Sequence, residues 1–167
     1  MSTETTESQA QAFRDAMAAV CTPVSVITAM EGDRPHGTTV SAFASLSVSP
    51  PMVLVALDSG SDLLEIIRSR RAFGVNILGT DQQGEALSFA RKGLDKFEGV
   101  PWTLTGGSPR LPDICGWLAC EVADFVPGGD HVIVLGNVLE AESNPRDPLT
   151  YHSRVFGTHR ALQETAS

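Results

Sequence analysis

Runs of apolar and β-branched residues recur along the chain and are separated by clusters of turn residues, which is the pattern of β-strands. These runs cover residues 23–30, 36–43, 52–57, 72–78, 117–126 and 131–141. Glu-Gly-Asp at 31–33 joins the first pair, and Pro-Gly-Gly-Asp at 127–130 joins the last pair. Both clusters contain the residues that tight turns require, so the sequence predicts two hairpins, of which the second is the longer.

Helical spacing is confined to three short segments. Phe13, Met17 and Val20 recur at i, i+4 and i+7 before Thr22-Pro23, a sequence that ends helices. The sequence LLEIIRSR follows Ser61 and Asp62, either of which is a suitable N-cap, and residues 82–92 have a third helical pattern. We expect residues 1–9 to be disordered, residues 10–162 to form one domain and residues 163–167 to be a tail.

About six strands with three short helices, and no regular alternation of strand and helix, favour an antiparallel barrel over a doubly wound parallel sheet. The length of 167 residues suits one domain, and 42% hydrophobic residues suffice for a core. The sequence therefore predicts a mainly β protein whose strands form an antiparallel barrel.

Charge restricts the possible partners. Twelve basic residues against twenty acidic ones give a formal net charge of −8, which argues against nucleic acid or an anionic membrane as the main partner. No apolar run approaches the roughly eighteen residues of a membrane helix, and the polar N-terminus is unlike a secretion signal, so we expect a cytoplasmic protein. The three cysteines form no CxxC pair and are expected to be buried free thiols.

Several common site motifs are missing. No two glycines are separated by a single residue, so a G-x-G-x-x-G nucleotide fingerprint is excluded. Gly74 and Gly79 have the spacing of a phosphate-binding loop, but the required lysine is absent. The chain also lacks H-E-x-x-H and G-x-S-x-G, and its histidines and cysteines share no zinc spacing, so no metal site is expected.

Hydroxyl groups and cations are each concentrated in one segment. TTVSAFASLSVSPP at 38–51 could donate many hydrogen bonds to a phosphate or a polar ring edge, or be an ordinary Ser/Thr-rich strand face. Arg91, Lys92 and Lys96, which include both lysines of the chain, lie beside Phe89 and Phe97. They suit a clamp on a phosphate and a ring, although cations are also favoured at a helix C-terminus.

Two further candidates lie near turns. His131 follows the Gly-Gly-Asp turn, where an imidazole could meet a ligand and exchange protons, or simply be solvated. Tyr151, His152 and Arg154 could add a ring and a cation to the same site, or contribute to a dimer contact.

Taken in order, these segments resemble the short-chain flavin reductase family, the NAD(P)H:flavin oxidoreductase components of two-component monooxygenases. The resemblance extends from about Phe13 to Arg160 and includes HGTTVSAFASLSVSPPMVLVAL, AFGVNIL, LSFARKGLDKFEG, the GGDH turn and PLTYHSRVF. It is greatest to the reductases that serve polyketide-tailoring oxygenases of actinomycetes. It implies a split β-barrel of the FMN-binding type, usually a homodimer, that uses FMN or FAD together with NADH or NADPH.

The resemblance also implies roles for particular residues. His131 would lie by the nicotinamide and is the expected catalytic residue. The positions expected to bind the cofactors are Thr39, Val40, Ser41 and Ala42 at the flavin ring edge, Ser45, Leu46 and Ser47 at its phosphate, Ser59 and Ser61 nearby, Asn76 near the flavin, Phe89, Arg91, Lys92, Lys96 and Phe97 over its phosphate and tail, and Tyr151 and Arg154 on the NADH side.

The expected activity is hydride transfer from NADH to flavin, with the reduced flavin diffusing to a separate monooxygenase. In such chemistry the cofactors supply the reactivity and the protein supplies orientation. Two alternatives stay open at this point: a flavin-binding carrier without reductase activity, and a barrel resembling pyridoxamine-phosphate oxidase. The chain is too short for separate flavin and nicotinamide domains, so both cofactors are expected to share one site.

Overall fold

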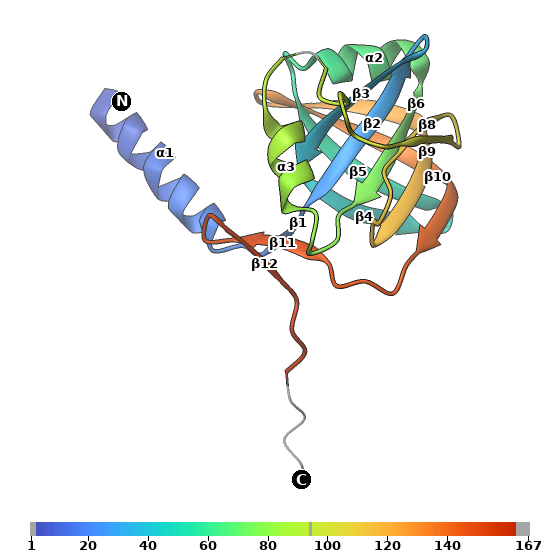
Figure 1. Cartoon of the computed structure of the whole chain (residues 1–167). Helices are drawn as coiled ribbons and strands as arrows, with labels where there is room; N and C mark the ends of the chain where they lie inside the picture. Colours follow the sequence, from blue (N-terminus) through green and yellow to red (C-terminus); the bar gives the residue numbers. More distant parts are fainter. Residues whose placement is uncertain (1–2, 94, 163–167) are drawn as a thin grey trace.

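The structure is a computed structural model that describes residues 3–93 and 95–162. Its helices are α1 (Thr3–Ala18), α2 (Asp62–Arg70) and α3 (Gln83–Ala90). Its strands are β1 (Thr22–Pro23), β2 (Ser25–Glu31), β3 (Arg34–Val40), β4 (Phe43–Val48), β5 (Pro51–Asp58), β6 (Ala72–Ile77), β7 (Thr103–Thr105), β8 (Ser108–Arg110), β9 (Gly116–Gly128), β10 (His131–Ser143), β11 (Leu149–His152) and β12 (Val155–Thr158). The body is a curled sheet from which α1 projects (Figure 1).

Seven strands form the main sheet in the order β3-β2-β6-β9-β10-β5-β4, with every pairing antiparallel. Although β3 and β4 are the two edges of this sheet, only Ser41 and Ala42 separate them in the chain. The sheet must therefore curl until its edges meet, and β3 indeed contacts β5 across the junction. We call residues 38–42, at this junction, the seam. The predicted mainly β, antiparallel barrel is confirmed.

The long hairpin of β9 and β10 follows the predicted boundaries to within two residues. Gly128 pairs with His131, so Gly129 and Asp130 alone form the turn, and Gly129 adopts the φ of +69° that favours glycine there. Burial alternates along the first half of β10, from His131 to Gly136, as expected for a strand with one face in the core, and the second half is exposed. A Cβ at Gly136 would lie 2.5 Å from Cζ of the buried Phe73, so the close packing there requires glycine.

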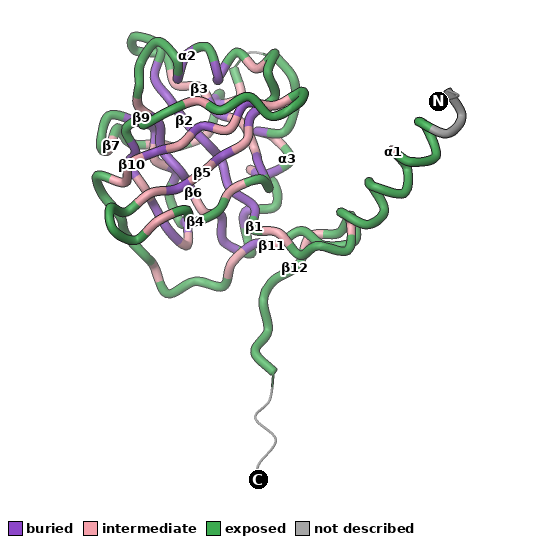
Figure 2. Tube along the Cα trace, turned by 180° about the vertical axis from the view of Figure 1, so that it is seen from behind, coloured by how far each residue is buried: buried purple, intermediate pink, exposed green. Residues whose placement is uncertain are grey.

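The core has two parts. In the first, α2 covers one end of the barrel with Leu63, Leu64, Ile66 and Ile67, which pack on apolar residues of the strands. In the second, Phe89 of α3 packs in a cluster with the fully buried Trp117. Buried residues are concentrated in the barrel, whereas α1 and its surroundings are mostly exposed (Figure 2). The α2 and α3 helices predicted from the sequence are thus confirmed, and their apolar faces fix two walls of the site described below.

A projecting arm consists of α1 and the small sheet β1-β11-β12. Arg154 donates to the carboxylate of Asp15 at 2.7 Å, which joins the β11–β12 turn to α1. Residues 1–9 are expected from the sequence to be disordered, whereas in the structure α1 begins at Thr3; residues 1–2 and the tail expected at 163–167 lie outside the described residues. The sequence pattern gives no helix signal over residues 3–9, because this segment has no apolar stripe.

Other differences concern short strands and the cysteines. β4 makes residues 43–48 of the hydroxyl-rich segment a strand, in agreement with the second interpretation of that segment as a Ser/Thr-rich strand face. The hairpins β7–β8 and β11–β12 were not expected. Cys120 is buried as predicted, but Cys115 is half-buried and Cys21 is exposed, because each lies beside a strand end rather than within a strand. Within residues 3–93 and 95–162, no helix combines the length and apolarity needed to cross a bilayer.

Candidate functional site

A groove runs from the seam to the N-terminal end of α2 and consists of two adjoining cavities. The seam cavity, of about 250 Å³, is lined by residues 38–42, 56–58, Ser61 and His131. The second, of about 350 Å³, is lined by residues 34–38, 58, 60–63, 90–93 and 95–97, and we call it the cation cavity. Thr38, Asp58 and Ser61 line both cavities, so a ligand longer than either can occupy the two together.

At the seam, the backbone itself is the main source of hydrogen-bond donors. Thr39 uses its hydroxyl to bond the carbonyl oxygen of Ala86 at 2.7 Å, which fixes α3 against β3. The carbonyl of Ala42 accepts from the N–H of Ala56 at 2.9 Å. The N–H groups of Ser41 and Ala42, in contrast, have no partner among the described residues. Both residues are exposed, so these donors are free to bind a polar ring edge.

His131 reaches the seam cavity from the start of β10. Its Nδ1 lies 2.8 Å from Oδ1 of Asp130, and this hydrogen bond, together with the charge of His131, lowers the pKa of Asp130. The carbonyl of Asp130 accepts from the N–H of Ser59 at 3.0 Å, which ties the turn to the loop before α2. The imidazole is therefore oriented by its neighbour, and Nε2 is left for a ligand.

The N-terminal end of α2 opens into the cation cavity. Ser61 is the N-cap residue, yet its side chain makes no capping hydrogen bond. The N–H groups in the first turn of a helix lack intrahelical partners and carry partial positive charge, which suits a phosphate. Asp58 accepts from the N–H of Gly60 at 2.8 Å and so shapes the preceding loop. Asp62 lies at the same end and adds a carboxylate, so an anion bound here also needs cations from the opposite wall.

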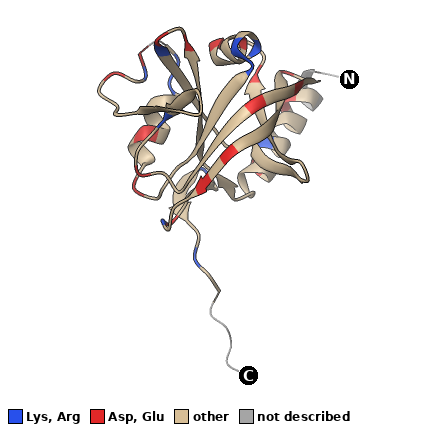
Figure 3. Cartoon of the chain, turned by 90° about the vertical axis from the view of Figure 1, so that its right-hand side faces the viewer, with Lys and Arg blue, Asp and Glu red and all other residues tan. Residues whose placement is uncertain are grey.

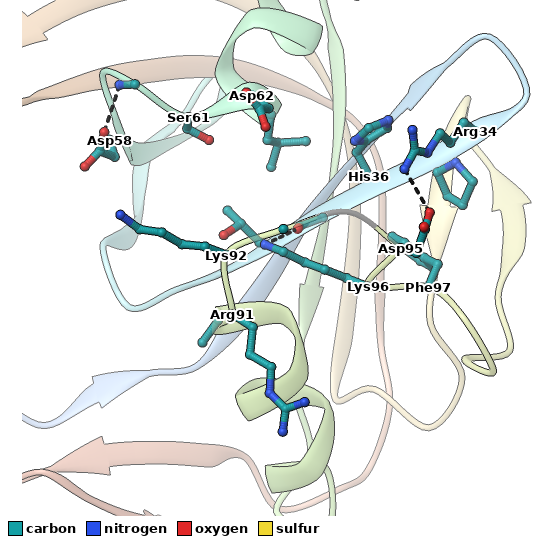
Figure 4. A pocket seen from close by; sticks show the side chains of 17 residues that line it. Arg34, His36, Asp58, Ser61, Asp62, Arg91, Lys92, Asp95, Lys96 and Phe97 are labelled. Carbon is teal, nitrogen blue, oxygen red and sulfur yellow. Dashed lines mark hydrogen bonds and ion pairs between the residues drawn. The ribbon is translucent and has the colours of Figure 1, made fainter.

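That opposite wall is the segment after α3, but its three cations differ in what they do. Lys96 donates to the carbonyl oxygens of Phe89 at 3.0 Å and Gly37 at 3.2 Å, and its burial lowers its pKa. In Figure 4, Lys92 extends toward the loop of Asp58 and Ser61, whereas the guanidinium of Arg91 points the other way. Lys92 is therefore the cation best placed to meet an anion at the end of α2.

Phe97 lines the cation cavity and packs edge-on against the buried Phe89, with 4.8 Å between the ring centroids. Arg34 of β3 and Asp95 form an ion pair of 2.8 Å at the outer side of the same cavity. Figure 3 shows the wider pattern: basic residues gather in α2 and in the segment after α3, while acidic residues also occur along the outer strands. The negative net charge is thus compatible with a local anion site.

Several predicted residues do not line the groove. Asn76 is fully buried, where its amide donates toward Val26, Thr28 and Pro109 and its Oδ1 accepts from the N–H of Leu111, so it has no group left for a flavin. Phe89 is equally buried and reaches the site only through Phe97.

The remaining exceptions lie elsewhere on the surface of the chain. Ser45, Leu46 and Ser47 belong to the edge strand β4 and line neither cavity, and Ser59 contributes only its backbone bond to Asp130. Tyr151 and Arg154 are on the arm, where Tyr151 packs on Phe156 and Arg154 binds Asp15. The groove brings together Thr39, Val40, Ser41, Ala42, Ser61, Arg91, Lys92, Lys96, Phe97 and His131.

Sequence reasoning missed Arg34, His36, Asp58 and Asp62 as groove residues. Arg34 and His36 flank a proline just after a turn, a context without any site signal. Asp58 and Asp62 lie at the two ends of the loop between a strand and a helix. Aspartates are common in turns and at helix N-termini, so their presence there gives no separate signal of a site.

Comparison with known proteins gives three results. The family profile described as flavin reductase like domain matches residues 17–160. The chain is 39% identical to the reductase component of a 4-nitrophenol 4-monooxygenase/4-nitrocatechol 2-monooxygenase from Rhodococcus opacus, over 87% of this chain and 78% of that protein. It is 38% identical to an NADH:riboflavin 5'-phosphate oxidoreductase from Streptomyces pristinaespiralis, over 89% of this chain and 87% of the relative.

Among solved structures, an NADH:FAD oxidoreductase of Streptomyces globisporus in complex with NAD and FAD fragments superposes with a TM-score of 0.84. The sequence identity is 29%, and the match covers 96% of each chain. The sequence matches and the backbone superposition therefore agree, and both extend over nearly all of the described chain.

Proposed function

The chain belongs to the family of flavin reductase-like domains, and from this premise we propose that it is an NAD(P)H-dependent flavin reductase. It would transfer hydride from NADH, or NADPH, to FMN or FAD and supply the reduced flavin to a partner monooxygenase. The observation that carries this assignment is the continuous groove, which offers free backbone N–H groups at the seam and Lys92 opposite the end of α2.

The groove fits a flavin at both ends. Free N–H groups at Ser41 and Ala42 match the carbonyl and nitrogen acceptors along the polar edge of a flavin ring. The first turn of α2 and Lys92 match a phosphate, with the Ser61 hydroxyl as a further donor. Thr39 and Val40 contribute by holding the seam in shape, since one bonds α3 and the other is buried.

When bound, the flavin accepts a hydride from the nicotinamide, so the protein's task is to hold the two rings together. N–H donors at the seam would stabilise negative charge on the reduced ring. His131 would orient the nicotinamide, with Asp130 holding the imidazole in position through Nδ1. Every one of these contributions is a matter of orientation and fixed dipoles rather than of covalent chemistry.

The direct test is to follow the loss of NADH absorbance in air, with FMN or FAD added to the purified chain. Turnover with either flavin is expected, and parallel reactions with NADPH measure the nicotinamide preference. A chain that binds flavin tightly but consumes neither nicotinamide would instead be a flavin carrier, and the proposed function would be wrong.

We further propose that the chain acts as a homodimer and hands reduced flavin to its monooxygenase by diffusion. The arm supports the dimer because it leaves Phe13, Met17, Val20 and Val155 exposed on a helix and hairpin that project from the barrel. Light scattering should give the mass of two chains, and Phe13→Asp combined with Met17→Asp should give one. An unaltered mass in that double variant would contradict the use of this face.

A further inference from the structure

A histidine and a glutamate of the β2–β3 hairpin form a pair at the edge of the cation cavity. His36 lines this cavity, and Figure 4 shows it beside Arg34, at the end away from Asp58. Its side chain is only 16% exposed, and its Nε2 lies 3.2 Å from Oε2 of Glu31. The Glu31 side chain, in contrast, is 63% exposed, so the pair joins an enclosed imidazole to a solvated carboxylate.

This pairing determines which ring nitrogen of His36 is available to a ligand. Because Nε2 faces a carboxylate, the neutral ring favours its proton on Nε2, and Nδ1 then presents a lone pair. Nδ1 makes no hydrogen bond to any described residue. When the ring gains a proton, Nδ1 becomes a donor while Nε2 keeps Glu31 as its partner. Protonation therefore converts the available nitrogen from an acceptor into a donor.

An anion distinguishes these two forms of His36. A phosphate offers only acceptors, so the lone pair of the neutral ring repels it, whereas the N–H and the charge of the imidazolium attract it. A phosphate at the N-terminal end of α2 would share the cation cavity with His36. Burial alone disfavours a charged imidazole, and Glu31 and the anion would offset that cost from two sides.

Other charged groups face His36 from the neighbouring elements. Arg34 is paired with Asp95 at 2.8 Å. His36 also lines a third cavity, between the β2–β3 turn and α2, to which Glu65 and Arg70 contribute. Histidine is the only residue type in this set whose ordinary pKa lies between about 5 and 8. The remaining charged residues that line the two cavities are Glu31, Asp58, Asp62, Arg91, Lys92 and Lys96.

We propose that His36 is a proton-linked anion-binding residue, which takes up a proton from solvent when a nucleotide phosphate enters the cation cavity, and that Glu31 is its positioning residue. Two sources share this chemistry, namely the phosphate of FMN and the diphosphate of NADH. The inference rests on the proposed function for the choice of these two ligands. It goes beyond that function because it makes the affinity for a cofactor depend on pH.

Titration calorimetry counts the protons. FMN and NADH are titrated separately into the full chain in two buffers of about pH 7 that differ in ionisation enthalpy. At least one of them should bind with uptake of about half a proton, and its affinity should fall about fivefold between about pH 6.5 and pH 8.5. Riboflavin, which has the ring but no phosphate, should show neither effect, and this separates His36 from the seam residue His131.

Two matched variants identify the group that takes up the proton. His36→Gln keeps a polar side chain that cannot be charged, so it should abolish both the proton uptake and the pH dependence. His152→Gln removes an exposed histidine of β11 that lines none of the three cavities, and it should behave like the wild type. Equal proton uptake in wild type and His36→Gln, or no uptake with either ligand in the wild type, would overturn the proposal.

Glu31→Gln tests the pair while leaving His36 in place. Because the imidazolium loses its carboxylate partner, the pH dependence of affinity should move to lower pH. A purely structural contact would change the free energy of unfolding and leave this pH profile unchanged, which would refute the role of Glu31. Failure of the proposed function is a separate result, because it would remove NADH turnover with flavin, whereas the proton count comes from binding alone.

Discussion

The ammonium group of Lys96 lies 3.2 Å from the carbonyl oxygen of Gly37 and thereby joins the segment after α3 to strand β3. A second bond of 3.0 Å, to the carbonyl of Phe89, caps the C-terminal end of α3. Gly37 permits the close packing of α3 on β3, because a Cβ at this position would lie 3.0 Å from the ring of Phe89. Lys96 thus serves the architecture, whereas the role proposed for Lys92 is binding of an anion.

Replacing each lysine by methionine should separate these two roles. Lys96→Met removes two charge-assisted hydrogen bonds, and we expect a loss of about 1–2 kcal/mol in the free energy of unfolding, measured with urea. Lys92→Met should leave stability within about 0.5 kcal/mol, because its side chain is exposed.

For flavin affinity, in contrast to stability, Lys92 should matter more than Lys96. Lys92→Met should raise the dissociation constant for FMN about fivefold, as expected for one exposed ion pair, and leave riboflavin unaffected. If Lys92→Met weakened FMN and riboflavin equally, its ammonium would not be the phosphate partner.

His131→Ala should lower NADH turnover far more than flavin affinity, because the imidazole faces the seam cavity from the β10 side while the flavin is held by other groups. Asp130→Asn should produce a smaller loss, since the ring stays in place but loses the carboxylate at Nδ1. Steady-state kinetics over NADH concentration, with flavin binding measured separately, checks both. Unchanged NADH kinetics in His131→Ala would exclude the role given to His131.

Asn76→Ala should destabilise the chain by about 2–3 kcal/mol, because it leaves the buried N–H of Leu111 and nearby carbonyl groups unsatisfied. Urea unfolding measures this loss, and Asn137→Ala on β10, where the side chain is only partly buried, should cost less. The folded Asn76→Ala protein should bind FMN like the wild type. A selective loss of flavin binding without loss of stability would restore the role expected from the family resemblance.

The arm should loosen in acid. The hydrogen bond from Arg154 lowers the pKa of Asp15 from its ordinary value of 3.8. A carboxyl group whose pKa is lowered by folding stabilises the fold above its unfolded pKa, and that contribution is lost as the pH falls through the lower, folded value. NMR shifts of α1 should therefore report its release from the β11–β12 turn below about pH 3.8, and Asp15→Asn should show the released state already at neutral pH. A variant with wild-type shifts at neutral pH would show that this ion pair does not hold the arm.

Much of the barrel could be predicted from the sequence because its strands are apolar and its turns carry glycine, as in the β9–β10 hairpin. The arm could not, since β11 and β12 are four residues each and Thr3–Ala18 has too few apolar positions to mark its whole length. Their structure depends on pairing between distant segments, such as Thr22 with Tyr151.

Within the groove, the structure places Lys92, which the cation cluster indicated, and His131, which the Gly-Gly-Asp turn indicated, while the roles given to them stay predictions. The family resemblance placed Asn76 near the flavin, whereas the structure buries its side chain and bonds its amide within the core, because a polar residue in a buried strand can serve the core as readily as a ligand. The third cavity, of about 510 Å³ between the β2–β3 turn and α2, left no pattern in the sequence, since these two segments meet only after folding.

The seam also bears on which substitutions this chain can accept during evolution. Its free donors at Ser41 and Ala42 are main-chain groups, so every residue except proline would preserve them. The side chains of Ser41 and Ala42 can therefore change, which would alter the shape of the seam cavity while both N–H donors remain. If the seam binds a flavin ring as proposed, its hydrogen-bond donors are therefore largely independent of side-chain identity, and substitutions there would change which ring is preferred without removing the donors.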